Sequence, residues 1–177
     1  MDLKPTLSSR ISMHNIHSIL YSAQGDEVRK QELYNLLNDK DDMVAYQAAW
    51  VMTHYSLHEN EWLYDKQNEL IDEAMSCKHT GKRRLILSLL FRQPMANPTR
   101  VDFLDFCLER MVSKREPVGI RSLCMKLAYE LCRPTPELVQ ELKTILEIMD
   151  GEISPGIQAV RNNILKAMKK RISLQII

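Results

Sequence analysis

The chain has 177 residues, with 24 Lys and Arg against 23 Asp and Glu, so its net charge is +1. A charge this close to zero excludes an overall electrostatic attraction to nucleic acid or to a membrane surface, and either function would need local segregation of charge. Because only five glycines and seven prolines occur and strong helix formers are plentiful, the composition predicts an all-α protein.

The N-terminal segment and the cysteines predict a cytoplasmic protein. The first ten residues lack the apolar core of a secretory signal, and no run of about 18 apolar residues could span a membrane. The four cysteines form no Cys-x-x-Cys pair and fall mostly at helical positions. Buried, reduced thiols are therefore expected, which points to a reducing compartment.

The elements predicted in chain order are an N-terminal helix, near residues 8–22, and four helical hairpins at about 26–57, 60–92, 99–132 and 136–171. Apolar residues recur at intervals of three and four within each helix, and short links join the helices. Capping residues support this division, since Thr135 and Ser154 each precede a proline at a helix start. The predicted helices of the hairpins are 26–38 and 43–57, 60–76 and 81–92, 99–113 and 118–132, and 136–149 and 155–171.

A small residue recurs near the start of each second helix, at Ala45, Gly81, Gly119 and Gly156. Such a period, in the range of 36 to 38 residues, is typical of a tandem array of helical hairpins. No linker rich in Gly, Ser or Pro divides the chain. The pattern predicts one domain over residues 1–177, an α-α superhelix (solenoid) of about four antiparallel hairpins behind an extra N-terminal helix.

Residues 41–50, with the sequence Asp-Asp-Met-Val-Ala-Tyr-Gln-Ala-Ala-Trp, resemble a HEAT repeat, in which an acidic turn leads into an Ala-rich second helix. The resemblance covers about residues 26–171. The arginine often found early in the second helix of that family is matched by Arg83 and Arg121, with Gln47 and Gln158 in the same column. An armadillo-like array and another α-α superhelix remain alternatives. The resemblance implies a binding scaffold in most cases and a DNA-alkylation-repair enzyme in a minority.

Charge separates between the two helices of the hairpins. The first helices together carry a net charge of −10 and the second helices +11, counted over 26–38, 59–76, 99–113 and 136–150, and over 43–57, 81–92, 118–133 and 155–171. The resemblance would place the second helices on the concave side of the superhelix. Solvated faces with weak ion pairs between the layers are an equally good interpretation.

Helical projection places three columns of side chains on the side of each second helix opposite its apolar stripe. The first column is polar, most of the second is apolar, and most of the third is aromatic, which is typical of protein-binding surfaces when exposed. Burial against neighbouring helices and contact between copies of the chain are the alternatives. The candidate partner-binding residues are Gln47, Tyr55, Arg83, Leu87, Phe91, Arg121, Met125, Tyr129, Gln158 and Lys166.

No catalytic, cofactor or metal site is predicted. Common nucleotide-binding and hydrolase motifs are missing, and the helical pair His54 and His58 lacks a clear third and fourth ligand. We therefore expect a non-enzymatic scaffold that binds an acidic or amphipathic segment of another protein on a basic, aromatic face.

Nucleic-acid binding, in the manner of HEAT-like alkylpurine glycosylases, is the main alternative and the only enzymatic one. A phosphate-binding groove would use the basic residues of the second helices. A structural or oligomeric role is a third possibility, in which the apolar residues after 171 cover a partner copy or the open end of the array. Docking of these residues against the last hairpin is the preferred interpretation. The oligomeric state itself is left open. The residues of the groove would be Arg83, Arg84, Arg121, Lys166, Lys169 and Lys170.

Overall fold

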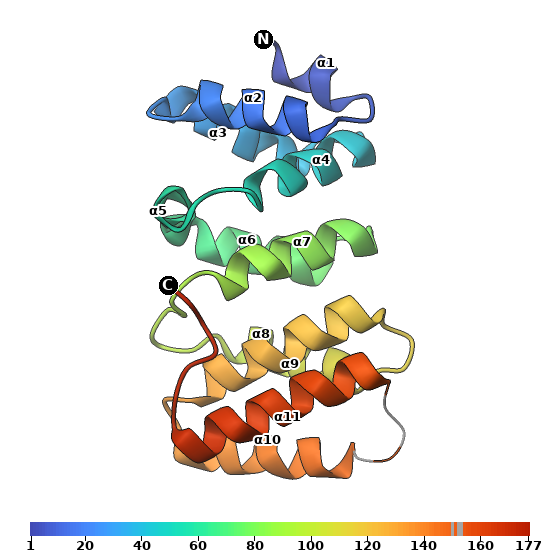
Figure 1. The fold of residues 1–177 in the computed structure, drawn as a ribbon, viewed down its shortest axis with the longest axis vertical. Coiled ribbons are helices and arrows are strands. Elements are labelled where there is room, and N and C mark those ends of the chain that lie inside the picture. The colour runs from blue at the N-terminus through green and yellow to red at the C-terminus, as the bar shows by residue number, and fades with distance from the viewer. Residues whose placement is uncertain (150, 152–153) are drawn as a thin grey trace. The chain divides into compact units, whose positions relative to one another are not determined.

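The computed structural model of the chain confirms the all-α prediction (Figure 1). It describes residues 1–149, 151 and 154–177, and the regular elements among these residues are α-helices and two short 3-10 helices, with no strand. Consecutive helices pair as hairpins within each part of the chain, as an α-helical repeat solenoid requires.

The N-terminal segment contains two helices where one was predicted over residues 8–22. Helix α1 covers Leu3–Leu7 and α2 covers Met13–Ala23. Between them, Ser12 and Asn15 form a capping box, because the Asn15 side chain accepts from the Ser12 N–H at 2.9 Å and the Ser12 hydroxyl accepts from the Asn15 N–H. This reciprocal cap fixes the start of α2 five residues later than predicted.

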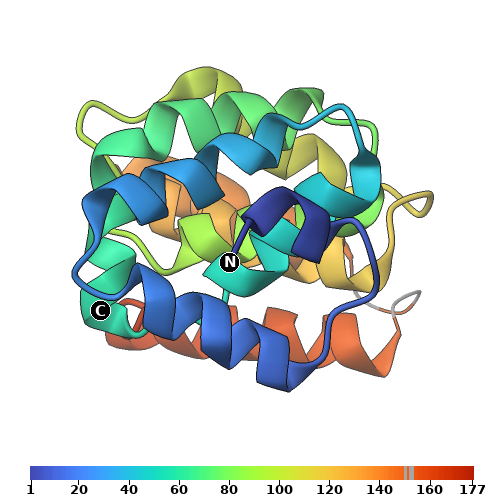
Figure 2. The ribbon, with the colours of Figure 1, turned by 90° about the horizontal axis from the view of Figure 1, so that it is seen from above.

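The first predicted hairpin consists of α3 (Glu27–Asn35), the 3-10 helix η1 (Leu36–Asn38) and α4 (Asp42–Met52). Figure 2 shows the turn that joins α2 to α3, where Gly25 has a φ of +73° that an L side chain would disfavour. The buried side chains of α4 include two alanines, Ala48 and Ala49, which let neighbouring helices approach closely.

The second hairpin begins earlier and is more broken than predicted. Helix α4 stops at residue 52 instead of 57, because Ser56 and Glu59 form another capping box that starts α5 (Leu57–Asn60). The predicted helix 60–76 is split into the 3-10 helix η2 (Glu61–Lys66) and α6 (Gln67–Ser76). The second helix of the hairpin, α7 (Thr80–Phe91), matches its prediction.

The last two hairpins follow the predicted boundaries closely. They consist of α8 (Val101–Val112), α9 (Val118–Cys132), α10 (Pro136–Ile148) and α11 (Pro155–Lys170). Helix α9 is the centre of this region, since it packs against α8, α10 and α11. Ser154 caps α11 as predicted, whereas the Thr135 side chain makes no capping bond to α10. Residues 150, 152 and 153, between α10 and α11, lie outside the described part of the chain.

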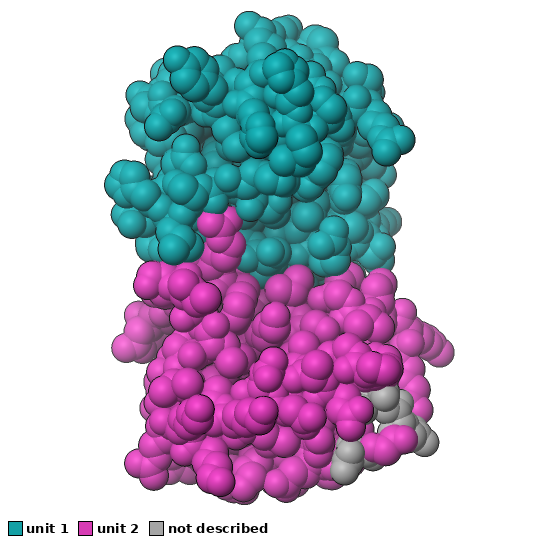
Figure 3. All heavy atoms as spheres, in the orientation of Figure 1, with its two compact units in different colours: residues 1–89 teal, residues 90–177 magenta. Residues whose placement is uncertain are grey.

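The chain divides into two compact units, residues 1–89 and residues 90–177 (Figure 3). The division falls inside α7, whose last two residues belong to the second unit. Each unit has its own buried core: Ile16, Leu33, Leu63 and Ile86 are among the fully buried side chains of the first, and Phe103 and Tyr129 among those of the second. The prediction of a single domain stays a prediction.

Candidate functional site

Arg83, which was predicted to bind a partner, is buried and holds its own hairpin together. Its Nε donates to the Ala74 carbonyl at 2.8 Å and its Nη2 to the Cys77 carbonyl at 2.5 Å. These carbonyls lie at the C-terminal end of α6, where backbone oxygens have no partner within the helix. A guanidinium satisfies several of them at once and also opposes the negative end of the helix dipole.

The same bond recurs in both hairpins of the second unit. Arg121 Nε donates to the Met111 carbonyl at 3.0 Å, at the end of α8, and Arg161 Nε donates to the Leu146 carbonyl at 2.6 Å, near the end of α10. In the last hairpin this role therefore belongs to Arg161, three residues after Gln158. Gln158 itself is exposed.

Gln47 occupies the corresponding position in α4 and is also buried. Its Nε2 donates to the Leu7 carbonyl at 2.8 Å and to the Ser9 carbonyl at 2.6 Å, while its Oε1 accepts from the Ile11 N–H at 3.0 Å. These groups belong to the end of α1 and to the link between α1 and α2. Three of the four residues of the polar column, Gln47, Arg83 and Arg121, thus form bonds within the chain, which corrects the expectation of an open polar column; Gln158 is exposed.

The apolar and aromatic columns are largely core as well, so they do not form the open greasy face that helical projection suggested. The physical reason is that other parts of the chain cover this side of α4, α7 and α9, which projection of one isolated helix cannot reveal, whereas on α11 the column residues Gln158 and Lys166 are exposed. Phe91 is half-buried. The buried members among the candidates are Tyr55, Leu87, Met125 and Tyr129.

The exposed cations of the second helices gather at the end of α11. Lys166, Lys169, Lys170 and Arg171 are all exposed, and within the described residues none of these side chains makes an ion pair. Lys166 is thus the predicted binding residue that lies in the main exposed basic run of the chain. We call these four residues the α11 basic surface.

Other cations of the second helices are engaged inside their units. Lys82 pairs with Glu73 at 2.6 Å, and Lys126 lies over the Phe91 ring at 5.5 Å. Arg133 pairs with the buried Glu130 at 3.0 Å. Because these cations interact within the chain, fewer of the basic residues counted from the sequence are free to bind a partner. The remaining ones are concentrated on α11.

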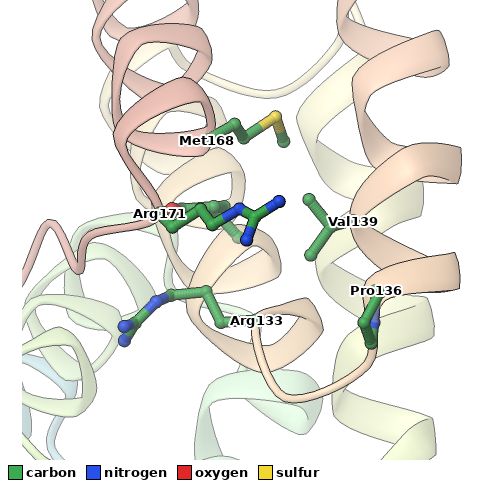
Figure 4. A pocket seen from close by; sticks show the side chains of 6 residues that line it. Arg133, Pro136, Val139, Met168 and Arg171 are labelled. Atoms are coloured by element: carbon green, nitrogen blue, oxygen red, sulfur yellow. The ribbon is translucent and has the colours of Figure 1, made fainter.

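A pocket of about 380 Å³ adjoins the α11 basic surface. It lies between the C-terminal end of α9, the first turn of α10 and the last turn of α11 (Figure 4). The guanidinium of Arg171 extends between Met168 and Val139, whereas that of Arg133 points away. Apolar walls beside one cation can hold a ligand that is apolar and anionic. The lining residues are Tyr129, Arg133, Pro136, Val139, Met168 and Arg171.

Arg171 has an unfavourable backbone conformation. Its φ of 55° and ψ of 42° are left-handed, and it is the single non-glycine residue with positive φ in the described part of the chain. Glycine is the usual residue at such a helix end, because the left-handed conformation costs other residues roughly 1–2 kcal/mol. Bonds from Arg171 N to the Met168 carbonyl and from Ile172 N to the Ala167 carbonyl hold this turn.

The C-terminal tail, residues 172–177, fixes the side of the pocket formed by Arg171. Tyr129 Oη donates to the Ile172 carbonyl at 2.6 Å, and burial raises the pKa of the Tyr129 hydroxyl, which keeps it a donor. The apolar tail was expected to dock through its side chains, yet Ile172 is 50% exposed and Ile176 84%. The tail is held by polar contacts instead.

Glu130 provides the main anchor for the tail. Its Oε1 accepts from the Ser173 hydroxyl at 2.9 Å and from the Leu174 N–H at 2.7 Å. Farther along, the Gln175 side chain donates to the Phe91 carbonyl at 2.8 Å. These bonds make the tail a fixed strap along the second unit, and so the backbone that carries Arg171 is ordered.

The cysteines form no disulfide and no metal site. All four are free thiols; Cys107, Cys124 and Cys132 are buried as predicted, and Cys77 is half-buried. Burial raises the pKa of the Cys107 thiol well above its usual value, and burial together with Glu141 raises that of Cys132 to about 11. The described residues contain no cluster of three metal-ligating side chains.

Sequence reasoning missed Arg171, Val139 and Met168 as neighbours. Arg171 was counted among the basic residues but was not predicted to bind a partner, because its position at the left-handed end of α11 is a feature of the folded chain. The sequence offered one sign of this position: no glycine follows the helical pattern of residues 155–171. Val139 and Met168 belong to different helices and meet only in the folded unit.

Comparison with known proteins identifies a repeat family. A family model described as a HEAT repeat domain matches residues 3–168, which includes the N-terminal helices that precede the predicted hairpins. Comparisons with curated proteins and with solved structures give no match. In the described part of the chain, every helix is too short or too polar to cross a bilayer.

Proposed function

Since the chain belongs to the HEAT repeat family, we propose that it is a non-enzymatic scaffold whose α11 basic surface binds an acidic segment of another protein. HEAT repeat domains generally serve in protein interactions and are typically non-enzymatic. The main support is that Lys166, Lys169, Lys170 and Arg171 are exposed together without ion pairs among the described residues. Clustered, unpaired cations favour association with an oppositely charged partner and accelerate the encounter.

The site proposed here is smaller than the ten-residue face predicted from the sequence. Lys166 is the candidate that belongs to the α11 basic surface; Gln158 is exposed on α11 outside it, and Phe91 and Arg121 are half-buried. Among the buried candidates, Met125 and Tyr129 lie on α9, which packs against α11. A partner would therefore be recognised by charge on α11 and not by an aromatic groove along all second helices.

The test compares two triple charge reversals as baits in an extract of the native cell, with captured proteins quantified by mass spectrometry. Lys166→Glu, Lys169→Glu and Lys170→Glu together should remove acidic partners that the wild-type chain retains. The matched control, Lys40→Glu with Lys78→Glu and Arg84→Glu, changes three exposed cations of the first unit by the same charge. Equal retention by both variants would show that the α11 basic surface is not the binding site.

The nucleic-acid alternative has less support. Two of the six basic residues predicted for a phosphate-binding groove, Arg83 and Arg121, use their Nε groups on backbone carbonyls. These bonds hold both guanidiniums against the end of the preceding helix, and Arg83 is also buried. Lys166, Lys169, Lys170 and the exposed Arg84 are left for this role.

A further inference from the structure

We propose that the pocket beside Arg171 seats a bulky apolar side chain of the partner while Arg171 binds an adjacent carboxylate. This inference rests on the proposed function and specifies the chemistry of the bound segment: an acidic residue next to a leucine, isoleucine, methionine or phenylalanine. The pocket, at about 380 Å³, is at the small end of ligand sites, as a side-chain anchor requires.

The walls of the pocket select an apolar group. Val139, Met168 and Pro136 are apolar lining residues, and they lie around the Arg171 guanidinium (Figure 4). A side chain that packs against these walls beside the guanidinium would remove apolar surface from water, which is the main source of affinity at interface anchors. A free phosphate would leave these walls unused.

The position of Arg171 selects a carboxylate beside that apolar group. Its guanidinium extends over the apolar walls, and within the described residues it has no acidic partner of its own. Arg133, the other arginine of the lining, is already paired with Glu130. One planar cation above an apolar pocket matches a single carboxylate, which it can bind through two parallel hydrogen bonds.

The backbone of Arg171 supports a binding role independently of the pocket. A left-handed residue at a helix end is normally glycine, and an arginine there is unfavourable for stability. Unfavourable backbone conformations of this kind are concentrated at binding and active sites, where the surrounding structure holds them and the side chain is needed for function. The bond from Tyr129 to Ile172 and the turn bonds of Arg171 hold its backbone, so the guanidinium is presented by a fixed turn.

This geometry allows a test that separates binding from stability. Arg171→Gly removes the guanidinium but relieves the left-handed backbone, so the variant should fold and melt at the same temperature or higher. Arg115→Ala is the matched control, since it removes an exposed guanidinium of the same unit that belongs neither to the pocket nor to the α11 basic surface. Val139→Asp is a second pocket variant, which puts a negative charge where the anionic segment would lie.

The probe is a phage library of random twelve-residue peptides, selected on the folded wild-type chain and counter-selected on Arg171→Gly. Enriched peptides should carry an acidic residue adjacent to a bulky apolar one. By fluorescence anisotropy, the best labelled peptide should bind Arg171→Gly and Val139→Asp at least about tenfold more weakly, and Arg115→Ala within about twofold.

Two outcomes would overturn the inference. One is enrichment of peptides without the acidic–apolar pair, or of none; the other is equal affinity for wild type and Arg171→Gly. If acidic peptides bind both of these proteins equally but lose affinity for the triple Lys→Glu variant, the pocket assignment fails while the proposed function stands. If the triple variant also binds them normally, both fail.

Discussion

Three arginines of the second helices, Arg83, Arg121 and Arg161, share one structural task. Each donates its Nε to a carbonyl near the end of the preceding helix, with distances of 2.8, 3.0 and 2.6 Å. These bonds give a hydrogen-bond donor to carbonyls at the helix ends, which have no donor within their own helix and would otherwise be removed from water without one. They also explain why an arginine is common at this place in the repeat: its side chain is long enough to bring a charged guanidinium from the second helix to the carbonyls at the end of the first.

Replacement of Arg83 should therefore be strongly destabilising. In Arg83→Met the carbonyls of Ala74 and Cys77 lose their donors, and we expect the free energy of unfolding to fall by about 2–4 kcal/mol. Arg84→Met, at the exposed neighbouring position, should change it by less than about 0.5 kcal/mol. Urea unfolding followed by circular dichroism measures both variants, and a mild effect at Arg83 would mean that the clasp contributes little.

The cysteines lead to a prediction about reactivity. Since the thiolate is the reactive form, Cys132 with its pKa near 11 and the buried Cys107 should not react with a disulfide reagent at pH 8 in the native protein. Cys77, half-buried and with its pKa raised by burial, should react first but slowly. A thiol assay should count one reactive group in native protein, four in guanidinium chloride, and none in native Cys77→Ser.

The same shifts give a pH dependence. A thiol whose pKa is raised by folding keeps a proton that the unfolded chain releases above about pH 8.5. Its contribution to stability is therefore complete below that pH and is lost as the pH rises toward 11. Two or more thiols reacting within minutes at pH 8 would contradict both the burial of Cys107 and Cys132 and the upward shift of their pKa values, on which this pH dependence rests.

At the scale of helices, the sequence predicted most boundaries because they depend on local chemistry. Prolines at 136 and 155 start α10 and α11, and the capping serine at 154 is used as expected. The failures are also local: the capping boxes at Ser12 and Ser56 define helix starts that apolar periodicity passes over. Periodicity shows which side of a helix is apolar, but reciprocal caps decide where it begins.

The candidate site was harder to predict because it depends on contacts between helices. Projection places Gln158 in the same column as Arg83 and Arg121, yet Arg161 makes the equivalent bond in the last hairpin. A change of three residues is nearly one helical turn, so both residues lie on almost the same side of α11. The distance to a carbonyl on another helix decides between them, and no single-helix pattern contains that distance.

The repeated small residues of the second helices should respond differently to alanine. At Gly156 an added Cβ would lie 3.5 Å from the nearest side chain, that of Val118, so Gly156→Ala should raise the free energy of unfolding by up to about 1 kcal/mol through helix propensity. At Gly81 the Cβ would lie 3.0 Å from Tyr46 Cε2 and 3.1 Å from His79 Cε1, which offsets that gain.

Both glycines occupy the second position of their helices, α7 and α11, so each substitution controls for the other. Thermal melts of the two variants give the comparison directly. We expect Gly156→Ala to melt above Gly81→Ala. The reverse order would mean that the rings of Tyr46 and His79 move aside easily and that Gly81 is not required for close packing.

Across the whole chain, charge segregation counted from the sequence overstates what is available for binding. The second helices carry a net charge of +11, but bonds to backbone carbonyls, a buried carboxylate and an aromatic ring engage Arg83, Arg133 and Lys126, among others. The free cations of these helices are therefore concentrated on α11. A count of charges from the sequence does not identify which of them the chain neutralises itself.

This charge distribution predicts weak, salt-sensitive binding to DNA. A contact made by the four cations of the α11 basic surface would release few counterions, and affinity would fall roughly a hundredfold between about 50 and 200 mM salt. Gel shifts with duplex and single-stranded DNA should show a faint complex at the lower salt concentration and none at the higher. The triple reversal at Lys166, Lys169 and Lys170 should abolish even the faint complex, and a reversal at the exposed cations Arg10, Lys40 and Lys78 should preserve it. A submicromolar complex that survives 200 mM salt would require more phosphate contacts than α11 offers, and it would favour the nucleic-acid alternative over the protein scaffold.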